Sequence, residues 1–265
     1  MHWIIDNKFD HDPKILELIN NLIRLNISYS RVKTRSFDME YIEFENSNES
    51  IEMFNDKKVF SYGSYTLANI CAKLFNPGAY ISPNISIETL LQNYNKNMLN
   101  SDTIIDTIQN INPTMDSFFL RPNEDTKSII AELVTKDNFN KWKTNILKLN
   151  LQEDTYCTLH SDTKICISSP KKIDAEYRCF IACKKVIAAS QYKRGNTPYF
   201  NNNVDSYIID YTNDIISTWT PDDAFVIDIA LMANKLYVIE CNCINSSGFY
   251  DIDTQKLIMA IENNL

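Results

Sequence analysis

The sequence predicts an α+β protein in which a small N-terminal α/β lobe, residues 1–112, precedes a larger α+β domain, residues 113–265. Two observations predict this arrangement. Short apolar strands alternate with helices in the first part of the chain, which is typical of a small α/β unit. After Asn112-Pro113 strands follow one another with few helices between them, which indicates antiparallel sheets with helices packed on one face.

The helices give the clearest signals in the N-terminal lobe. Apolar residues recur at helical spacing from Pro13 to Leu25, and proline suits the first turn of a helix. A second helix is expected from Tyr65 to Phe75, where the segment Asn76-Pro77-Gly78 ends it. The other elements expected here are strands at Trp3–Ile5, Ser28–Val32 and Val59–Ser61, and a helical connecting segment at Ser86–Asn110.

The second domain is predicted from apolar runs of strand length separated by a few longer helical segments. Its polar loop Gly195–Asn203, which follows the basic pair Lys193-Arg194, suits a mobile lid over phosphates; the alternative is a plain surface hairpin loop. The expected strands are Ser117–Arg121, Ser128–Val134, Lys164–Ser168, Tyr177–Ala182 and Lys185–Tyr192, then a hairpin of Phe225–Leu231 and Leu236–Asn242, and the expected helices are about Asn138–Leu149, Val204–Thr218 and Asp253–Asn263.

The hairpin carries two carboxylates inside apolar strands. If Ala233–Lys235 form a three-residue loop, Asp228 lies directly opposite Glu240. Two like charges at that spacing destabilise a sheet unless something neutralises them, and a divalent cation would do so. Asp228, Glu240 and Asn242 offer the hard oxygen ligands that Mg²⁺ prefers. Alternatively, a two-residue loop shifts the register, so that Glu240 is a solvated edge residue and Asp228 a hydrogen-bonded core acid.

Basic residues stand at the ends of other strands. Arg121 and Lys127 flank a proline-containing turn and could bind phosphate oxygens, or else be solvated turn residues paired with Glu124 and Asp125. Glu176 and Arg178 share one face of their strand. The segment Asn245-Ser-Ser-Gly248 after the hairpin is able to line a carboxylate or phosphate pocket, or to be ordinary turn chemistry.

Composition limits the class of protein. A formal net charge of −8 argues against broad nucleic-acid binding, and four glycines exclude a Walker-type loop or a dinucleotide fingerprint. No signal peptide or apolar stretch of membrane-spanning length is found, so we expect a cytoplasmic protein without a membrane. The seven cysteines are interpreted as mostly buried free thiols, and no spacing favours zinc. The cysteines placed in apolar runs are Cys71, Cys166, Cys179, Cys183 and Cys241.

Taken in order, these residues resemble the ATP-grasp superfamily. The matching pieces are the strand with Arg121, the segment Glu176-Tyr-Arg-Cys-Phe-Ile181, then Asp228, and Glu240-Cys-Asn242. More narrowly, the chain is similar to a divergent clade that contains the eukaryotic cell-division-cycle protein assisting assembly of a translation initiation factor, together with bacterial and viral relatives. The similarity runs from about Phe118 to the C-terminal end of the sequence.

The resemblance implies an ATP-grasp fold, with ATP held between two α+β subdomains built on antiparallel sheets. It implies Mg²⁺ on Asp228, Glu240 and Asn242, and it places the strand Ile165–Ser169 against the adenine as a hinge. Arg178 and Lys127 are the implied catalytic residues. The residues expected to bind ATP are Arg121, Lys127, Ile167, Ser168, Glu176, Arg178 and Lys193.

The function that the resemblance favours is an ATP-dependent carboxylate–amine ligase acting through an acyl phosphate. Its substrates would be small-molecule or protein carboxylates and amines. The alternative is an ATP-binding assembly factor with little or no turnover, which would work with a protein partner. RNA end-joining is disfavoured by the acidic composition, and a non-enzymatic α+β protein would require the other hairpin register.

Overall fold

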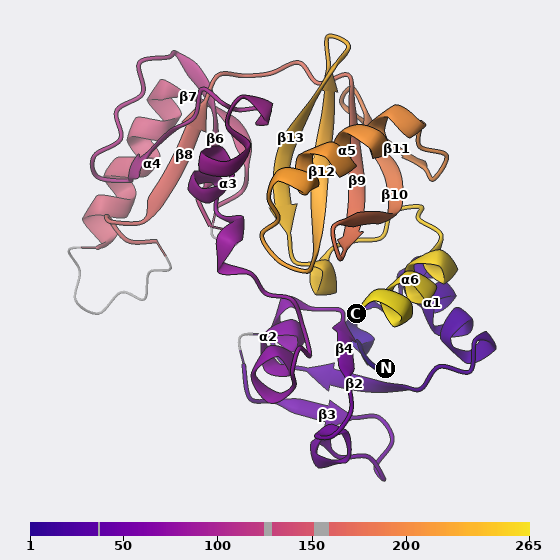
Figure 1. Cartoon of the computed structure of the whole chain (residues 1–265). Coiled ribbons are helices and arrows are strands. Elements are labelled where there is room, and N and C mark those ends of the chain that lie inside the picture. The colour runs from indigo at the N-terminus through magenta and orange to yellow at the C-terminus, as the bar shows by residue number, and fades with distance from the viewer. Residues whose placement is uncertain (37, 125–128, 151–158) are drawn as a thin grey trace.

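Three sheets make up the computed structural model, which describes residues 1–36, 38–124, 129–150 and 159–265 (Figure 1). The helices are α1 (Pro13–Arg24), α2 (Tyr65–Leu74), α3 (Ile87–Tyr94), α4 (Lys136–Leu149), α5 (Ser206–Thr218) and α6 (Thr254–Asn264). The strands are β1 (His2–Asp6), β2 (Tyr29–Thr34), β3 (Ile42–Phe44), β4 (Val59–Tyr62), β5 (Ile104–Thr107), β6 (Ser117–Pro122), β7 (Glu132–Thr135), β8 (Lys164–Ser168), β9 (Ala175–Ala182), β10 (Lys185–Arg194), β11 (Thr197–Asn201), β12 (Ala224–Met232) and β13 (Lys235–Asn242).

The N-terminal lobe is the predicted α/β unit. Its sheet has the order β3-β2-β1-β4, with β1 parallel to both β2 and β4. Helix α1 begins where the side chain of Asp12 caps the amide of Lys14, and it packs on one face of the sheet, whereas α2 packs on the other. The short edge strand β3 was not predicted, because three residues are too few to show a period.

The central sheet is antiparallel throughout and has the order β11-β10-β9-β12-β13. Helices α5 and α3 cover one face, where Cys179 and Ile227 lie in the core. Two-residue turns with positive φ at both positions join β9 to β10, at Cys183-Lys184, and β12 to β13. The other face is polar along half its length, and that half forms one wall of the site.

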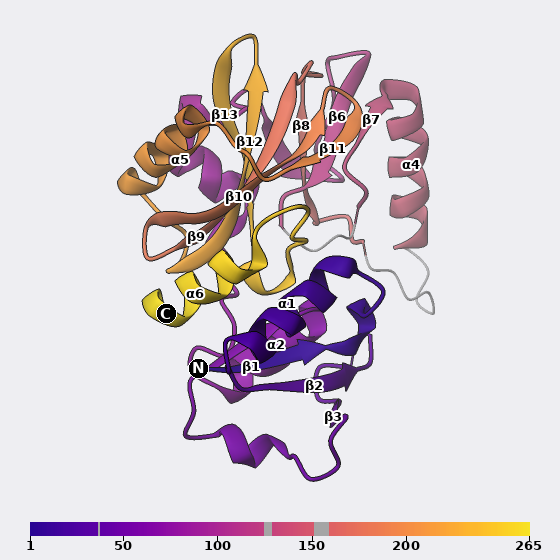
Figure 2. The same cartoon turned by 90° about the vertical axis from the view of Figure 1, so that its right-hand side faces the viewer.

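The third sheet is smaller, antiparallel, and has the order β5-β8-β6-β7, with α4 on its outer face (Figure 2). Strand β5 corrects the prediction that Ser86–Asn110 is helical and connecting: α3 fills only its first part. Four residues of β5 are held by pairing with β8, a long-range contact that local sequence does not show. The predicted lobe boundary at residue 112 therefore falls after the first strand of this sheet.

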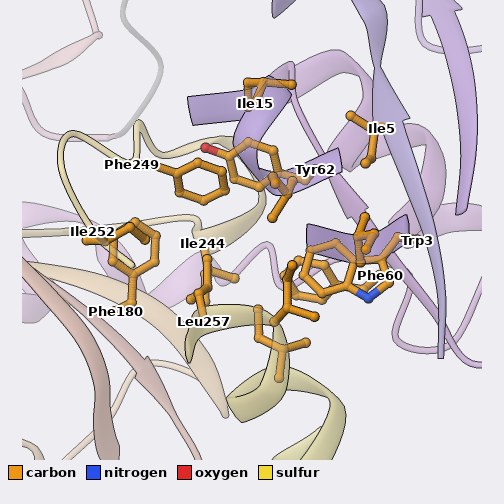
Figure 3. Close-up of a cluster of buried hydrophobic side chains, with 14 of the residues drawn as sticks. Trp3, Ile5, Ile15, Phe60, Tyr62, Phe180, Ile244, Phe249, Ile252 and Leu257 are labelled. Carbon is orange, nitrogen blue, oxygen red and sulfur yellow. The ribbon is translucent and has the colours of Figure 1, made fainter. Parts of the chain in front are cut away.

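A single apolar core joins the N-terminal lobe to the central sheet (Figure 3). Trp3 and Tyr62 from the lobe meet Phe180 from β9 and Phe249 from the segment after β13, and Tyr62 stacks on Phe249 with ring centroids 4.1 Å apart. Helix α6, although last in sequence, packs against α1 (Figure 2). The two ends of the chain thus share one core.

Two further predictions are corrected. Residues of the expected lid Gly195–Asn203 form strand β11, which pairs with the end of β10, so this segment is a hairpin. Cys183 is exposed at the β9–β10 turn, whereas Cys71, Cys166, Cys179 and Cys241 are buried as reduced thiols. In the described residues, no helix is long and apolar enough to cross a membrane.

Gly63 is expected to be essential for folding of the N-terminal lobe. Its φ is +147°, and a Cβ there would lie 2.4 Å from the Cβ of Asp6. Gly63→Ala should lower the free energy of unfolding by about 2–5 kcal/mol in urea titration, from strain and overpacking together. Gly195→Ala is the matched control, because φ there is +55° and nothing lies within 4 Å; its cost should be about 1 kcal/mol. Equal costs would contradict the proposed crowding.

His2 should make the stability depend on pH. Its ring stacks on Phe54 and hydrogen-bonds Ser28 and Ser30, and burial, followed by the charge of Lys57, lowers the pKa of His2 to about 4. The unfolded chain therefore takes up this proton near pH 6.5 and the folded chain only near pH 4. Stability should fall by up to about 3 kcal/mol across that window. In His2→Gln the fall should be smaller by that amount, measured as urea unfolding at each pH; parallel pH profiles would contradict this.

Candidate functional site

Two adjoining cavities lie between the central sheet and the third sheet. The first has a volume of about 340 Å³ and the second about 410 Å³, and Ala131 borders both. Such volumes and mixed walls are typical of small-molecule sites. The first is lined by Leu99, Asn100, Phe119, Ala131, Leu133, Ser169, Pro170, Lys171, Ile173, Glu176, Lys193, Gly195, Asn196 and Ile239. The second is lined by Arg121, Pro122, Glu124, Ile129, Ile130, Ala131, Arg178, Glu240, Asn242, Ser246, Ser247 and Gly248.

The register of the β12–β13 hairpin places Asp228 directly opposite Glu240, as predicted. The reason differs from the predicted one. The turn has two residues, Ala233 and Asn234, and a bulge at Ile239 restores the register, because Ile229 pairs with Val238 and Asp228 with Glu240. A bulge adds one residue to one strand and re-aims the side chains beyond it. Asp228, Glu240 and Asn242 therefore lie on one face.

Asp228 is buried and bound by Arg178, its neighbour across β9. The Nε and Nη2 atoms of Arg178 donate to the two carboxylate oxygens at 2.9 and 2.8 Å. Burial raises the pKa of Asp228, Arg178 opposes this rise, and Glu240 adds to it. The guanidinium also lies over the rings of Tyr250 and Tyr192, 4.9 and 5.7 Å from their centroids. A buried carboxylate is thus neutralised by a side chain held in an aromatic cage.

Glu240 has a different arginine as its partner. Arg121, which reaches across the cleft from β6, forms an ion pair with it, so Arg121 is not a turn residue paired with Glu124. Burial would raise the pKa of Glu240, but the charge of Arg121 and a hydrogen bond from Asn242 outweigh it and lower the pKa. The Nε of Arg121 is buried and has no hydrogen-bond partner among the described residues. This donor could bind a ligand oxygen.

The first cavity combines apolar walls with one charged cluster. Glu176 accepts hydrogen bonds from Tyr192 at 2.6 Å and from Lys193 at 2.8 Å. At the opposite side, Asp102 binds the amide of Ser169 and the ammonium of Lys171, which fixes the segment after β8. The cavity therefore offers a flat apolar volume with polar groups at two sides.

The loop after β13 joins the second cavity to the N-terminal lobe. Asn245 is fully buried: its amide donates to the Ser61 carbonyl at 2.6 Å and accepts from the amide of Tyr80 at 2.8 Å. Ser246, Ser247 and Gly248 line the cavity beside it. Asn245 thus fixes the loop, and the two serines that follow face the site.

The structure brings most of the predicted site residues together. Arg121, Arg178, Glu240 and Asn242 line the second cavity, Glu176 and Lys193 line the first, and Asp228 lies beneath Arg178.

Three predicted site residues stand apart. Ile167 packs in the core against α4, Ser168 is buried, and the cavity wall is instead formed by the residues that follow, Ser169 to Lys171. Lys127 lies outside the described residues. Sequence reasoning missed Phe119, although it shares a strand face with Arg121, and it missed Tyr192 and Tyr250.

A sequence profile described as an ATP-grasp domain, the second family of its clade, matches residues 99–260. The chain belongs to this family. The ATP-grasp resemblance found in the sequence is thereby confirmed, and so is the ATP-grasp fold. Among curated proteins, no sequence matches this chain.

Solved structures agree with the ATP-grasp fold over the whole chain. D-cycloserine synthetase DcsG has a TM-score of 0.61 at 9% identity, covering 99% of both chains. The ATP-grasp ligase PsnB, complexed with its minimal precursor, has 0.56 at 9% identity over 98% of both. D-alanine–D-alanine ligase from Bacillus anthracis has 0.56 at 13% identity, covering 100% of this chain and 93% of the ligase. At such identities the likeness is one of fold.

A double-mutant cycle should show strong coupling between Arg178 and Asp228. Removing one partner of a buried pair leaves an unpaired charge, which costs about 3–5 kcal/mol. Arg178→Met and Asp228→Leu should each have that effect, and the double variant should cost at least about 2 kcal/mol less than their sum. The matched pair Arg121 and Glu240 is more exposed, at 16% and 26%, and its coupling should be about 1 kcal/mol. Additive urea-unfolding energies for Arg178 and Asp228 would contradict the assignment.

Proposed function

We propose that this ATP-grasp protein is an ATP-dependent ligase that joins a carboxylate to an amine through an acyl phosphate. The observation that carries the proposal is the two-part cleft between the antiparallel sheets. One part is apolar, and the other is lined by two arginines that face a row of carboxylates. The names of DcsG, PsnB and D-alanine–D-alanine ligase, which share the fold, support a synthetase or ligase.

ATP would fit the cleft with its base in the first cavity. Phe119, Leu133 and Ile239 offer apolar surface to a purine, and the segment Ser169–Lys171 offers backbone groups to its edge. The cluster of Glu176 and Lys193 would lie beside the sugar. The triphosphate would then extend past Ala131 into the second cavity, where Arg121 and Arg178 present planar donors suited to phosphate oxygens.

Asp228, Glu240 and Asn242 fit a magnesium ion by the chemistry of their donors. All three offer oxygen atoms on one sheet face, and in the described part of the chain no cluster of three or more histidine, cysteine or acidic residues provides another metal site. Each carboxylate now has an arginine as its counter-ion. Phosphates that take over these arginines would free both carboxylates for a cation. Mg²⁺ bound there would neutralise phosphate charge.

The proposed reaction needs no covalent enzyme nucleophile. A substrate carboxylate oxygen attacks the γ-phosphorus, the bond to the bridging oxygen breaks, and ADP leaves. The amine nitrogen then attacks the acyl carbon, inorganic phosphate departs, and the amide forms with loss of a proton from nitrogen. Arg121 and Arg178 would hold and neutralise the transferring phosphoryl group, and the wall formed by Ser246 to Gly248 would receive the substrates.

A second possibility, an ATP-binding assembly factor with little turnover, uses the same nucleotide site. Both arginines are already neutralised by carboxylates in this structure, which suits a site that holds ATP until a further partner arrives. Whether the substrates are small molecules or proteins, and whether the protein is cytoplasmic, stay predictions.

Calorimetric titration should show that ATP binds only weakly without Mg²⁺ and at least about ten-fold more tightly with it, because the ion screens phosphate from carboxylate. Glu240→Gln should lose most of the magnesium dependence. Glu132→Gln is the matched control, since Glu132 is an exposed acid in the third sheet outside both cavities; it should bind as wild type does. Absence of MgATP binding by the wild type would overturn the proposal.

Product analysis separates the two functions. A ligase should release ADP and phosphate, and faster when carboxylate and amine substrates are both present. Release of AMP would refute the acyl-phosphate route. Tight MgATP binding, with no ATP consumed across a broad set of acceptors, would favour the assembly factor.

A further inference from the structure

Tyr250 has a backbone conformation that bulky residues rarely adopt. Its φ is +53°, in the left-handed region. The other non-glycine residues with positive φ, among those the structure describes, are Asn26, Asn95, Cys183, Lys184, Ala233 and Asn234, so Tyr250 is the one aromatic residue of the set. Side chains with a Cβ lose free energy there, and such strain persists only where surrounding contacts enforce it.

The contacts of the Tyr250 ring explain how it is held. The ring stacks on Tyr192 at 4.7 Å and 12° and on Phe200 at 5.6 Å and 19°, and the guanidinium of Arg178 lies 4.9 Å from its centre. The described residues provide no hydrogen bond to its hydroxyl group. The aromatic face, rather than the hydroxyl, therefore makes the interactions.

Arg178 is the one charged member of this stack, and it still has hydrogen-bonding capacity. Two of its N–H groups bind Asp228 and a third points to the Gly248 carbonyl at 3.4 Å. A guanidinium has five N–H groups, so two are left for another acceptor. Because Arg178 lines the second cavity, that acceptor would be a ligand in the cavity.

We propose that Tyr250 is a positioning residue: its ring, held by a strained backbone, clamps Arg178 between Asp228 and Tyr192 so that the free N–H groups face the second cavity. The strain is the cost of bringing an aromatic face over the guanidinium directly after the Ser246–Gly248 wall. The clamp rests on the proposed function only for the identity of the ligand, which is a triphosphate. The clamp itself is a property of the nucleotide-free protein.

The first test requires no nucleotide. In a ¹⁵N spectrum of the arginine Nε groups, Arg178 should give a signal protected from solvent exchange, assigned by its loss in Arg178→Lys. Tyr250→Phe, which keeps the ring, should retain it. Tyr250→Gly should broaden or lose it, and glycine suits the left-handed backbone, so this variant should fold with a melting temperature at or above that of Tyr250→Ala. An unchanged Arg178 signal in Tyr250→Gly would overturn the proposal.

The second test measures MgATP affinity by calorimetry. Tyr250→Gly should raise Kd by about ten-fold or more, and Tyr250→Phe by less than about two-fold. Tyr199→Ala is the matched control, because Tyr199 also lies against an arginine, Arg194, at 4.0 Å, but on the surface hairpin; its Kd should equal that of the wild type. Weaker binding together with undiminished stability would distinguish positioning from a structural role.

The two tests separate two kinds of failure. If the wild type binds no MgATP while the Arg178 signal follows the ring at position 250, the clamp stands and the ligase proposal fails. If MgATP binds equally to wild type and Tyr250→Gly, or if Tyr250→Phe loses as much affinity as Tyr250→Gly, the clamp is overturned and the nucleotide site stands.

Discussion

The ion pair between Arg178 and Asp228 is the constraint on which the rest of the central sheet depends. Two buried charges on neighbouring strands are tolerable only when they are close and each is further satisfied. The backbone supplies the closeness, because β9 and β12 pair at these two residues. Since side chains alternate along a strand, the apolar residues between them must face α5. One pair therefore fixes which face is core and which face is site.

The site is electrically balanced across two sheets. Arg178 and Asp228 both come from the central sheet, whereas Arg121 of the third sheet crosses the cleft to Glu240. The cross-cleft pair ties the sheets together at the border between the two cavities. A polyanion entering the cleft would compete with the carboxylates for both arginines, and the gap left beside the carboxylates would favour a cation. Phosphate and metal would thus support each other's binding.

Much of this arrangement follows from sequence, and the failures have physical reasons. Period-two patterns placed Glu176 and Arg178 on one face, and the hairpin prediction opposed Asp228 and Glu240. The bulge at Ile239 was invisible, because it depends on pairing rather than residue type. The partnership of Arg178 with Asp228 requires β9 beside β12, a strand order that no local pattern specifies. Strands β3 and β5 were missed for the same reason, since each is held by a distant partner.

Helix α6 completes the core of a lobe whose strands come at the start of the chain. Leu257 and Ile261 cover Trp3 and Phe60, the Trp3 indole donates to Glu262 at 2.7 Å, and Lys58 reaches the carbonyl of Leu265. During synthesis the lobe's apolar surface would stay uncovered until α6 has left the ribosome. The N-terminal lobe is therefore not an independent folding unit, and its maturation waits for the sheet that carries the site.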